Sequence, residues 1–121
     1  MAAGDRLSDA DRVLIDASIR EAEQLCRHEF SVYVGPVDGD SRSFATSLHN
    51  SLVAPSHSVM ILVDPAARVV EVVTGGAVRP WLTDEEAEQA VVVMKDRFAQ
   101  GDLVGGLRQG IARMAILGRR D

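Results

Sequence analysis

The sequence predicts an α/β protein, specifically a three-layer α/β/α sandwich around a small mixed β-sheet. Residues 59–63 (VMILV) form a continuous apolar run, which is typical of a central strand buried on both faces. A strand-like run at 30–34 precedes it with a helical pattern between the two, which indicates a right-handed parallel crossover. A third run, at 69–74, follows after a connection too short for a crossover, so an antiparallel hairpin is expected. The predicted order is α-β-α-β-β-α-α.

The first helix is predicted within residues 7–29. Ser8 is its candidate N-cap, and the acidic residues of the first turn complement the helix dipole. Its apolar stripe consists of Ile15, Ile19, Ala22 and Cys26. The alternating strand that follows ends at Gly35 and Pro36. A second helix is then expected, with Ser41 as its cap. Its apolar stripe is Phe44, Leu48 and Leu52.

Two further helices are predicted after the hairpin. Thr83 and Glu86 form a capping box at the start of the first of them. Its apolar stripe is Ala87, Ala90, Val91, Met94 and Phe98. Gly101 suits the position just after the end of this helix, and Asp102 suits the N-cap of the next one. The last helix should turn Leu103, Leu107, Ile111 and Met114 inward, with Gly105 and Gly106 allowing close packing.

Length and charge favour one domain over residues 1–121, with fraying expected at 1–6 and 119–121. The net charge is −5 and the basic residues are scattered, so neither nucleic acid nor an anionic membrane is an expected partner. No apolar stretch approaches the ~20 residues that span a bilayer, so no membrane insertion is expected. Cys26 is the only cysteine, which excludes an intramolecular disulfide and agrees with a cytoplasmic location. The oligomeric state is left open.

Acidic side chains follow the predicted strands at the edge where ligands of open α/β sheets bind. Asp38 and Asp40 follow the first strand, and Asp64 ends the second. The long third helix runs back and should bring Asp102 to the same edge. These four carboxylates are therefore candidate ligands of Ca²⁺ or Mg²⁺. The alternative interpretation is structural, because each of the four also suits a turn or a helix cap.

The chain resembles the TPM domain family, a bacterial and plastid α/β module. The resemblance extends over roughly residues 7 to 117 and is carried by LSDADRVLIDASIREAE, FSVYV, MILVDPAARVVEVVTG, LTDEEAEQAVVVM and FAQGDLVGGLRQGI. The last stretch is the most specific, since family members typically carry an aromatic residue, a short gap, Gly-Asp and then Gly-Leu there. The resemblance implies the sandwich fold, with acid-phosphatase activity and a divalent-cation site in some members and assembly or auxiliary roles in others.

Three functions are open at this point. The preferred one is a binding or regulatory domain that takes a divalent cation at the acidic edge. The second is a metal-assisted acid phosphatase acting on small phosphate esters, with Asp64 and Arg68 as candidate catalytic residues and Arg68 as the phosphate clamp. The third is a structural or assembly subunit that binds a protein partner. Arg79 and Trp81 are its candidate contacts, because these residue types are enriched at interface hot spots. The alternative for Trp81 is a lid that folds back onto the core.

Overall fold

A computed structural model describes residues 7–120, and the fraying expected at 1–6 and at 121 lies outside that range. The chain forms four α-helices, three strands and a short 3₁₀ helix within the described residues. The elements are α1 (Asp9–Cys26), β1 (Glu29–Val34), α2 (Ser41–Asn50), η2 (Pro55–His57), β2 (Ser58–Asp64), β3 (Val69–Thr74), α3 (Asp84–Ala99) and α4 (Leu103–Leu117). The predicted element order is confirmed.

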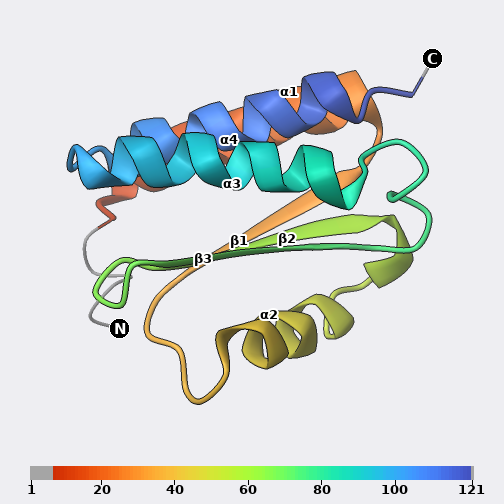
Figure 1. The fold of residues 1–121 in the computed structure, drawn as a ribbon. Coiled ribbons are helices and arrows are strands. Elements are labelled where there is room, and N and C mark those ends of the chain that lie inside the picture. The colour runs from red at the N-terminus through yellow and green to blue at the C-terminus, as the bar shows by residue number, and fades with distance from the viewer. Residues whose placement is uncertain (1–6, 121) are drawn as a thin grey trace.

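The sheet is mixed, and its strand order is β1-β2-β3. β1 and β2 are parallel from Glu29↔Ser58 to Val34↔Val63, and β2 and β3 are antiparallel from Val59↔Thr74 to Asp64↔Val69. Helices α1, α3 and α4 form a layer on one face and α2 lies on the other, as Figure 1 shows. The three-layer α/β/α sandwich, its parallel crossover and its hairpin are therefore as the sequence predicts.

The central strand β2 divides the hydrophobic core into two parts. Every residue of β2 is buried, because helices cover both of its faces. Val59, Ile61 and Val63 face the larger cluster, beneath α1, α3 and α4. Met60 and Leu62 face the smaller cluster, beneath α2. The cores on either side fix the sheet, and with it the positions of the loops at its two ends.

Helix caps agree with the sequence at α1, α3 and α4 but differ at α2. Asp40, not Ser41, is the N-cap of α2: its Oδ2 accepts the Ser43 N–H at 2.9 Å. Ser41 is the first helical residue, and its hydroxyl donates to Glu71 Oε2 at 2.7 Å. The carboxylate one residue earlier reaches the third helical N–H, which leaves the serine hydroxyl for β3. The predicted α2 stripe is only partly buried, whereas Ala45 and His49 are buried.

The joint between α3 and α4 is a close contact made by glycines. Gly101 has φ +82° and follows the cap of α3, which is the left-handed position that favours glycine. A Cβ on Gly106 would lie 2.4 Å from Phe98 Cε1, so Gly106 permits the helix packing expected of it. Glycine is needed at position 105 for a different reason: a Cβ there would lie 2.1 Å from the Asp102 carboxylate that caps the helix.

Candidate functional site

Asp64 ends β2 and ties two loops together. It is 6% exposed, and both of its carboxylate oxygens accept backbone N–H groups. Oδ2 accepts from Val37 in the loop after β1, and Oδ1 accepts from Ala67 in the hairpin turn, each at 3.2 Å. The residue therefore holds the carboxyl ends of β1 and β2 together.

Asp40 and Asp102 are N-caps on opposite faces of the sheet (Figure 1). The Asp102 Oδ1 accepts the Gly105 N–H at 2.9 Å, and Oδ2 accepts from Arg97 Nη2 at 2.9 Å. These two bonds, the backbone one first, lower the pKa of Asp102. Bonds from the Ser43 N–H and then the Ser43 hydroxyl lower the pKa of Asp40. Both carboxylates are thus engaged in capping.

The four candidate metal ligands do not form one group. Asp38 is exposed in the loop before α2, Asp64 is buried, and Asp40 and Asp102 cap helices of different layers. Within residues 7–120, no group of three or more His, Cys, Asp or Glu side chains is placed to hold a metal ion. The carboxylates share an end of the sheet, but the capping bonds of Asp40 and Asp102 hold these two on different sides of it.

A groove of about 630 Å³ opens between the β2–β3 turn and the α3–α4 joint. Its lining contains Asp64 and Arg68, which the sequence analysis proposed, together with Lys95, Phe98 and Leu103, which it missed. The other lining residues are Val63, Pro65, Val69, Val70, Ala99 and Gly101. The return of α3 toward the Asp64 edge was predictable, but the face of α3 that meets the turn was not.

Two cations at this groove have no partner in the described part of the chain. Arg68 is exposed in the hairpin turn at φ 57°, and Lys95 is exposed on α3. The side chains of both lack a hydrogen bond or ion pair with any residue between 7 and 120, whereas Arg97 and Arg42 are paired with Asp102 and Glu71. Phe98 and Leu103 add partly buried apolar surface to the same groove. Such a site suits an anion that carries an apolar group.

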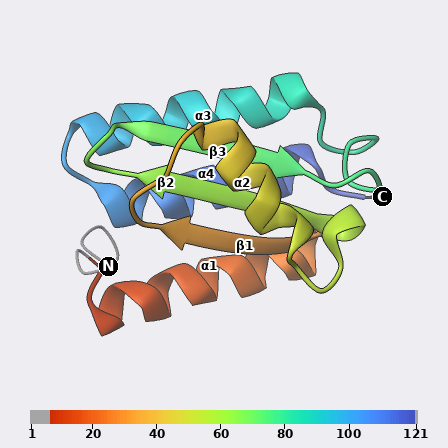
Figure 2. The same ribbon diagram turned by 90° about the horizontal axis from the view of Figure 1, so that it is seen from below.

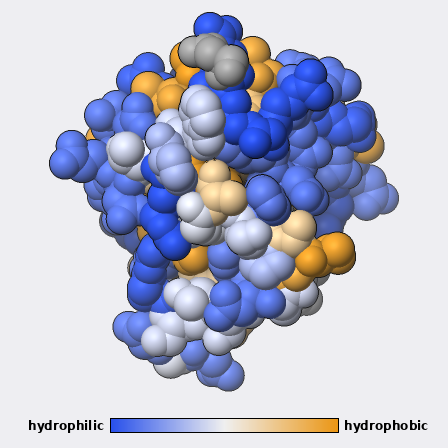
Figure 3. Space-filling model, turned by 90° about the vertical axis from the view of Figure 1, so that its right-hand side faces the viewer, coloured by the Kyte–Doolittle hydropathy of each residue, from blue (hydrophilic) through white to orange (hydrophobic). Residues whose placement is uncertain are grey.

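The loop between β3 and α3 contains the candidate partner contacts. Val78 and Leu82 are fully buried, so they close this end of the core in place of the lid considered for Trp81. Trp81 is 42% exposed. The Arg79 Nη1 donates to the carbonyl of Thr74 on β3. Figure 3 views this end of the molecule, whose surface is mostly hydrophilic with small, separate hydrophobic areas.

The family of the chain follows from its match to DUF5130, a domain of unknown function, over residues 3–115. The chain belongs to this family. The DUF5130 domain is 29% identical over 102 residues to the uncharacterized protein Rv2468c of Mycobacterium tuberculosis H37Rv, and equally to the uncharacterized protein MT2543 of strain CDC 1551. The match covers 84% of this chain and 61% of each relative, so the chain spans less than two thirds of their length.

Solved structures with the same fold are distant in sequence from the DUF5130 domain. BA42 from Bizionia argentinensis has a TM-score of 0.80 at 19% identity, over 92% of this chain and 80% of its own. The N-terminal domain of cg2496 from Corynebacterium glutamicum has a TM-score of 0.75 at 17% identity, over 92% of this chain and 73% of its own. An N-terminal domain of a protein from P. gingivalis has a TM-score of 0.76 at 19% identity, over 92% of this chain and 75% of its own. These similarities establish the fold alone.

None of the helices in the described part of the DUF5130 domain has the length and apolar character needed to cross a bilayer.

Proposed function

We propose that this DUF5130 domain is a TPM-like binding or regulatory module of the cytoplasm, whose groove at the α3–α4 joint takes a small anionic ligand with an apolar part. The supporting observation is that two cations without a partner among residues 7–120, Arg68 and Lys95, line the same groove as apolar side chains. A guanidinium binds phosphate or carboxylate through two parallel hydrogen bonds, and an ammonium adds a point charge. Phe98 and Leu103 contact the apolar part of the ligand.

Asp64 shapes this site rather than opposing an anion. Its oxygens accept two backbone N–H groups, and these partial positive charges offset its negative charge. It also holds the turn that carries Arg68. We therefore assign Arg68 and Lys95 the recognition of the ligand and Asp64 the positioning of the turn.

A metal-assisted acid phosphatase is the second candidate, because Asp64 and Arg68 line the same groove. In that reaction Ca²⁺ or Mg²⁺ would polarise a phosphoryl oxygen and activate water, and Arg68 would hold the phosphate. The cation would bind at the acidic edge, with Asp38, Asp40, Asp64 and Asp102 as candidate ligands. The loop at 37–40 would have to approach Asp64 more closely for this, and Asp40 and Asp102 would have to release the N–H groups they cap.

A role as an assembly subunit is the third candidate. The half-exposed Trp81 supports it, since a large aromatic side chain left outside the core is a common interface anchor. Arg79, the second candidate contact, also fixes the loop to β3 through its bond to the Thr74 carbonyl.

Titrations of ¹⁵N-labelled protein with inorganic phosphate and with phenyl phosphate separate these functions. Shifts at the amides of Arg68, Lys95 and Leu103 that are larger with phenyl phosphate support the groove. Arg68→Ala and Lys95→Ala should each weaken binding, whereas Arg113→Ala, on the exposed side of α4, should not. Equal weakening by all three variants, or no response in the millimolar range, refutes the proposal.

The same samples test the enzyme and the cation. Hydrolysis of phenyl phosphate that requires Mg²⁺ and disappears in Asp64→Ala would support the phosphatase, whereas binding without hydrolysis supports the binding module. Calcium chloride should shift the amides of residues 37–40 and 64 if a cation binds at the acidic edge. Activity that survives Asp64→Ala indicates a contaminant.

A further inference from the structure

The two edges of the sheet are closed to different extents. Gly75, directly after β3, donates its N–H to Ser58 O. The N–H and C=O groups of the even-numbered β3 residues therefore point away from β2. Arginines occupy two of these outward carbonyls: Arg42 Nη1 donates to Val72 O at 2.7 Å and Arg79 Nη1 to Thr74 O. The β3 edge therefore has little capacity to pair with another strand.

Beyond its first residues, the outer edge of β1 makes no hydrogen bond with any residue in the range 7–120. Gly35 N–H donates to Val63 O at 3.0 Å. Because backbone groups alternate in direction along a strand, the N–H and C=O groups of Ser31 and Tyr33 also face β2. The N–H and C=O groups of Phe30, Val32 and Val34 then point away from the sheet. Glu23 Oε2 accepts the Phe30 N–H at 2.9 Å, which confirms this direction.

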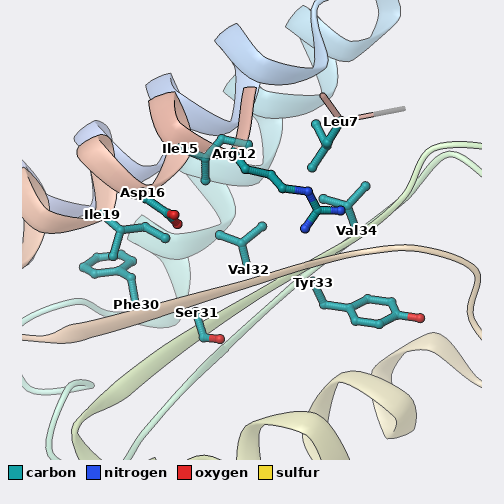
Figure 4. Close-up of a pocket in the computed structure, with 10 residues that line it drawn as sticks. All are labelled: Leu7, Arg12, Ile15, Asp16, Ile19, Phe30, Ser31, Val32, Tyr33 and Val34. Carbon is teal, nitrogen blue, oxygen red and sulfur yellow. The ribbon is translucent and has the colours of Figure 1, made fainter. Parts of the chain in front are cut away.

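A groove of about 450 Å³ lies between this edge and α1. Figure 4 shows Phe30 and Val32 facing Ile19 and Ile15 of α1, with Val34 farther along the strand near Arg12. Leu7 and the other lining residues, Arg12, Asp16, Ser31 and Tyr33, complete it. The groove is thus an apolar channel that runs along backbone groups with no partner in the described part of the chain, which is the combination that strand addition requires.

The charges along the groove differ between its two ends. Asp16 lies toward Phe30 in Figure 4, and Glu23 is bonded to the Phe30 N–H, so two carboxylates lie at that end of the groove. Glu29, exposed at the start of β1, adds a further carboxylate. Arg12 extends toward Val34 at the other end. A basic side chain on an incoming strand would be favoured at the Phe30 end.

The position of α1 decides between a partner segment and a second copy. Figure 2 shows α1 beyond β1, past the edge of the sheet, so α1 overhangs the position of an added strand. If two copies paired through β1, both of their α1 helices would lie over the junction between the two paired strands. Paired strands lie about 4.8 Å apart, whereas packed helices need about 8–10 Å. A single extended segment fits beneath α1 without this conflict.

We propose that the β1 edge binds one extended segment of a partner protein as a fourth strand. The segment has apolar side chains at alternate positions, which pack beneath α1, and a lysine or arginine beside Asp16 and Glu23. The site lies on the opposite edge from the Arg79–Trp81 loop, and the proposal does not depend on the anion groove.

The probes are two capped peptides, KTVTVT and TVTVTK, which place lysine and both valines on one face in either strand direction. One of them should shift the amides of Val32 and Val34 in the full-length protein and slow their hydrogen exchange. The corresponding peptide with glutamate in place of lysine should bind at least tenfold more weakly. The lysine peptide with N-methylated backbone amides, which cannot pair with a strand on one side, should not bind.

Proline at position 32 is the decisive variant, because the Val32 N–H makes no bond to β2. Proline is tolerated on an edge strand whose N–H faces outward, so Val32→Pro should fold and lose peptide binding. Val32→Thr keeps the N–H and should bind normally. Ile19→Glu changes the α1 side of the groove and leaves the strand itself unchanged. This independent variant should also weaken peptide binding at least tenfold.

Three results would overturn the proposal. The first is no binding of either peptide, and the second is peptide-induced shifts at Val72 and Thr74 instead of Val32 and Val34. The third is a dimer in sedimentation that Val32→Pro converts to a monomer, since a second copy would then occupy the edge.

Discussion

Gly75 and Gly76 are adjacent, yet the structure predicts opposite effects of adding one methyl group to each. A Cβ on Gly75 would lie 2.2 Å from the carbonyl oxygen of Pro55 and 2.3 Å from that of Ser56. A Cβ on Gly76 would meet only Arg79 Nη2, at 3.7 Å, an ordinary contact. Neither glycine has a left-handed φ, so alanine can adopt both conformations.

The cost at Gly75 follows from what the methyl group would displace. The obstacle is backbone of η2, held by the Ala77 N–H bond to Ser56 O, and Gly75 N–H itself is bonded to Ser58 O, both at 2.9 Å. Overpacking costs about 1–3 kcal/mol, and an immobile backbone places this site at about the upper end. The lower chain entropy of the unfolded alanine variant returns roughly 0.4–1 kcal/mol. A net loss of about 2 kcal/mol is expected.

Thermal unfolding followed by circular dichroism measures both effects. For a domain of this size, 1 kcal/mol corresponds to roughly 4 °C in melting temperature. Gly75→Ala should therefore melt about 8 °C lower. Gly76→Ala should match the wild type or melt up to about 4 °C higher, because only the entropy gain applies. Two variants that melt at the same temperature would refute this account of η2 packing.

Three other predictions test the site and the core. Asp64→Asn should lower the free energy of unfolding by about 1–3 kcal/mol in urea titrations, since one amide NH₂ must face an N–H donor; unchanged stability would contradict its bridging role. Burial lowers the pKa of His28 below 6.5, although the bond to Gly118 O acts in the opposite direction. The contribution of His28 to stability is therefore fully present above pH 6.5 and is lost as the pH falls below that value. His28→Asn should flatten this pH dependence of the unfolding free energy in urea titrations. Burial raises the pKa of the Cys26 thiol, so it should react with an aromatic disulfide reagent only after unfolding; rapid labelling of the native protein would contradict this.

Element types and boundaries were predictable because the forces that set them act over a few residues. The continuous apolar run of β2 requires cover on both faces, and the short connection to β3 permits only a hairpin. The capping box of Thr83 and Glu86 forms between neighbours three residues apart. Gly101 and Asp102 likewise take the cap positions that their own conformational and hydrogen-bonding preferences favour.

The candidate site depended on distances that no local pattern encodes. Which carboxylates meet depends on how each helix is rotated about its axis: Asp40 and Asp102 reach the same end of the sheet but lie in different layers, and nearby N–H groups engage both. The rotation of α3 brings Lys95 and Phe98 to the groove of Asp64 and Arg68.

The sequence by itself thus determined the fold class, the strand pairing and most helix caps, since these depend on periodicity and short-range bonding. Only the tertiary structure decided that Val78 and Leu82, rather than Trp81, close the core. It also decided that arginines block the β3 edge, while most of the β1 edge has no partner among the described residues. Those outcomes depend on which side chains meet across the packed layers, and residues far apart in the chain make those contacts.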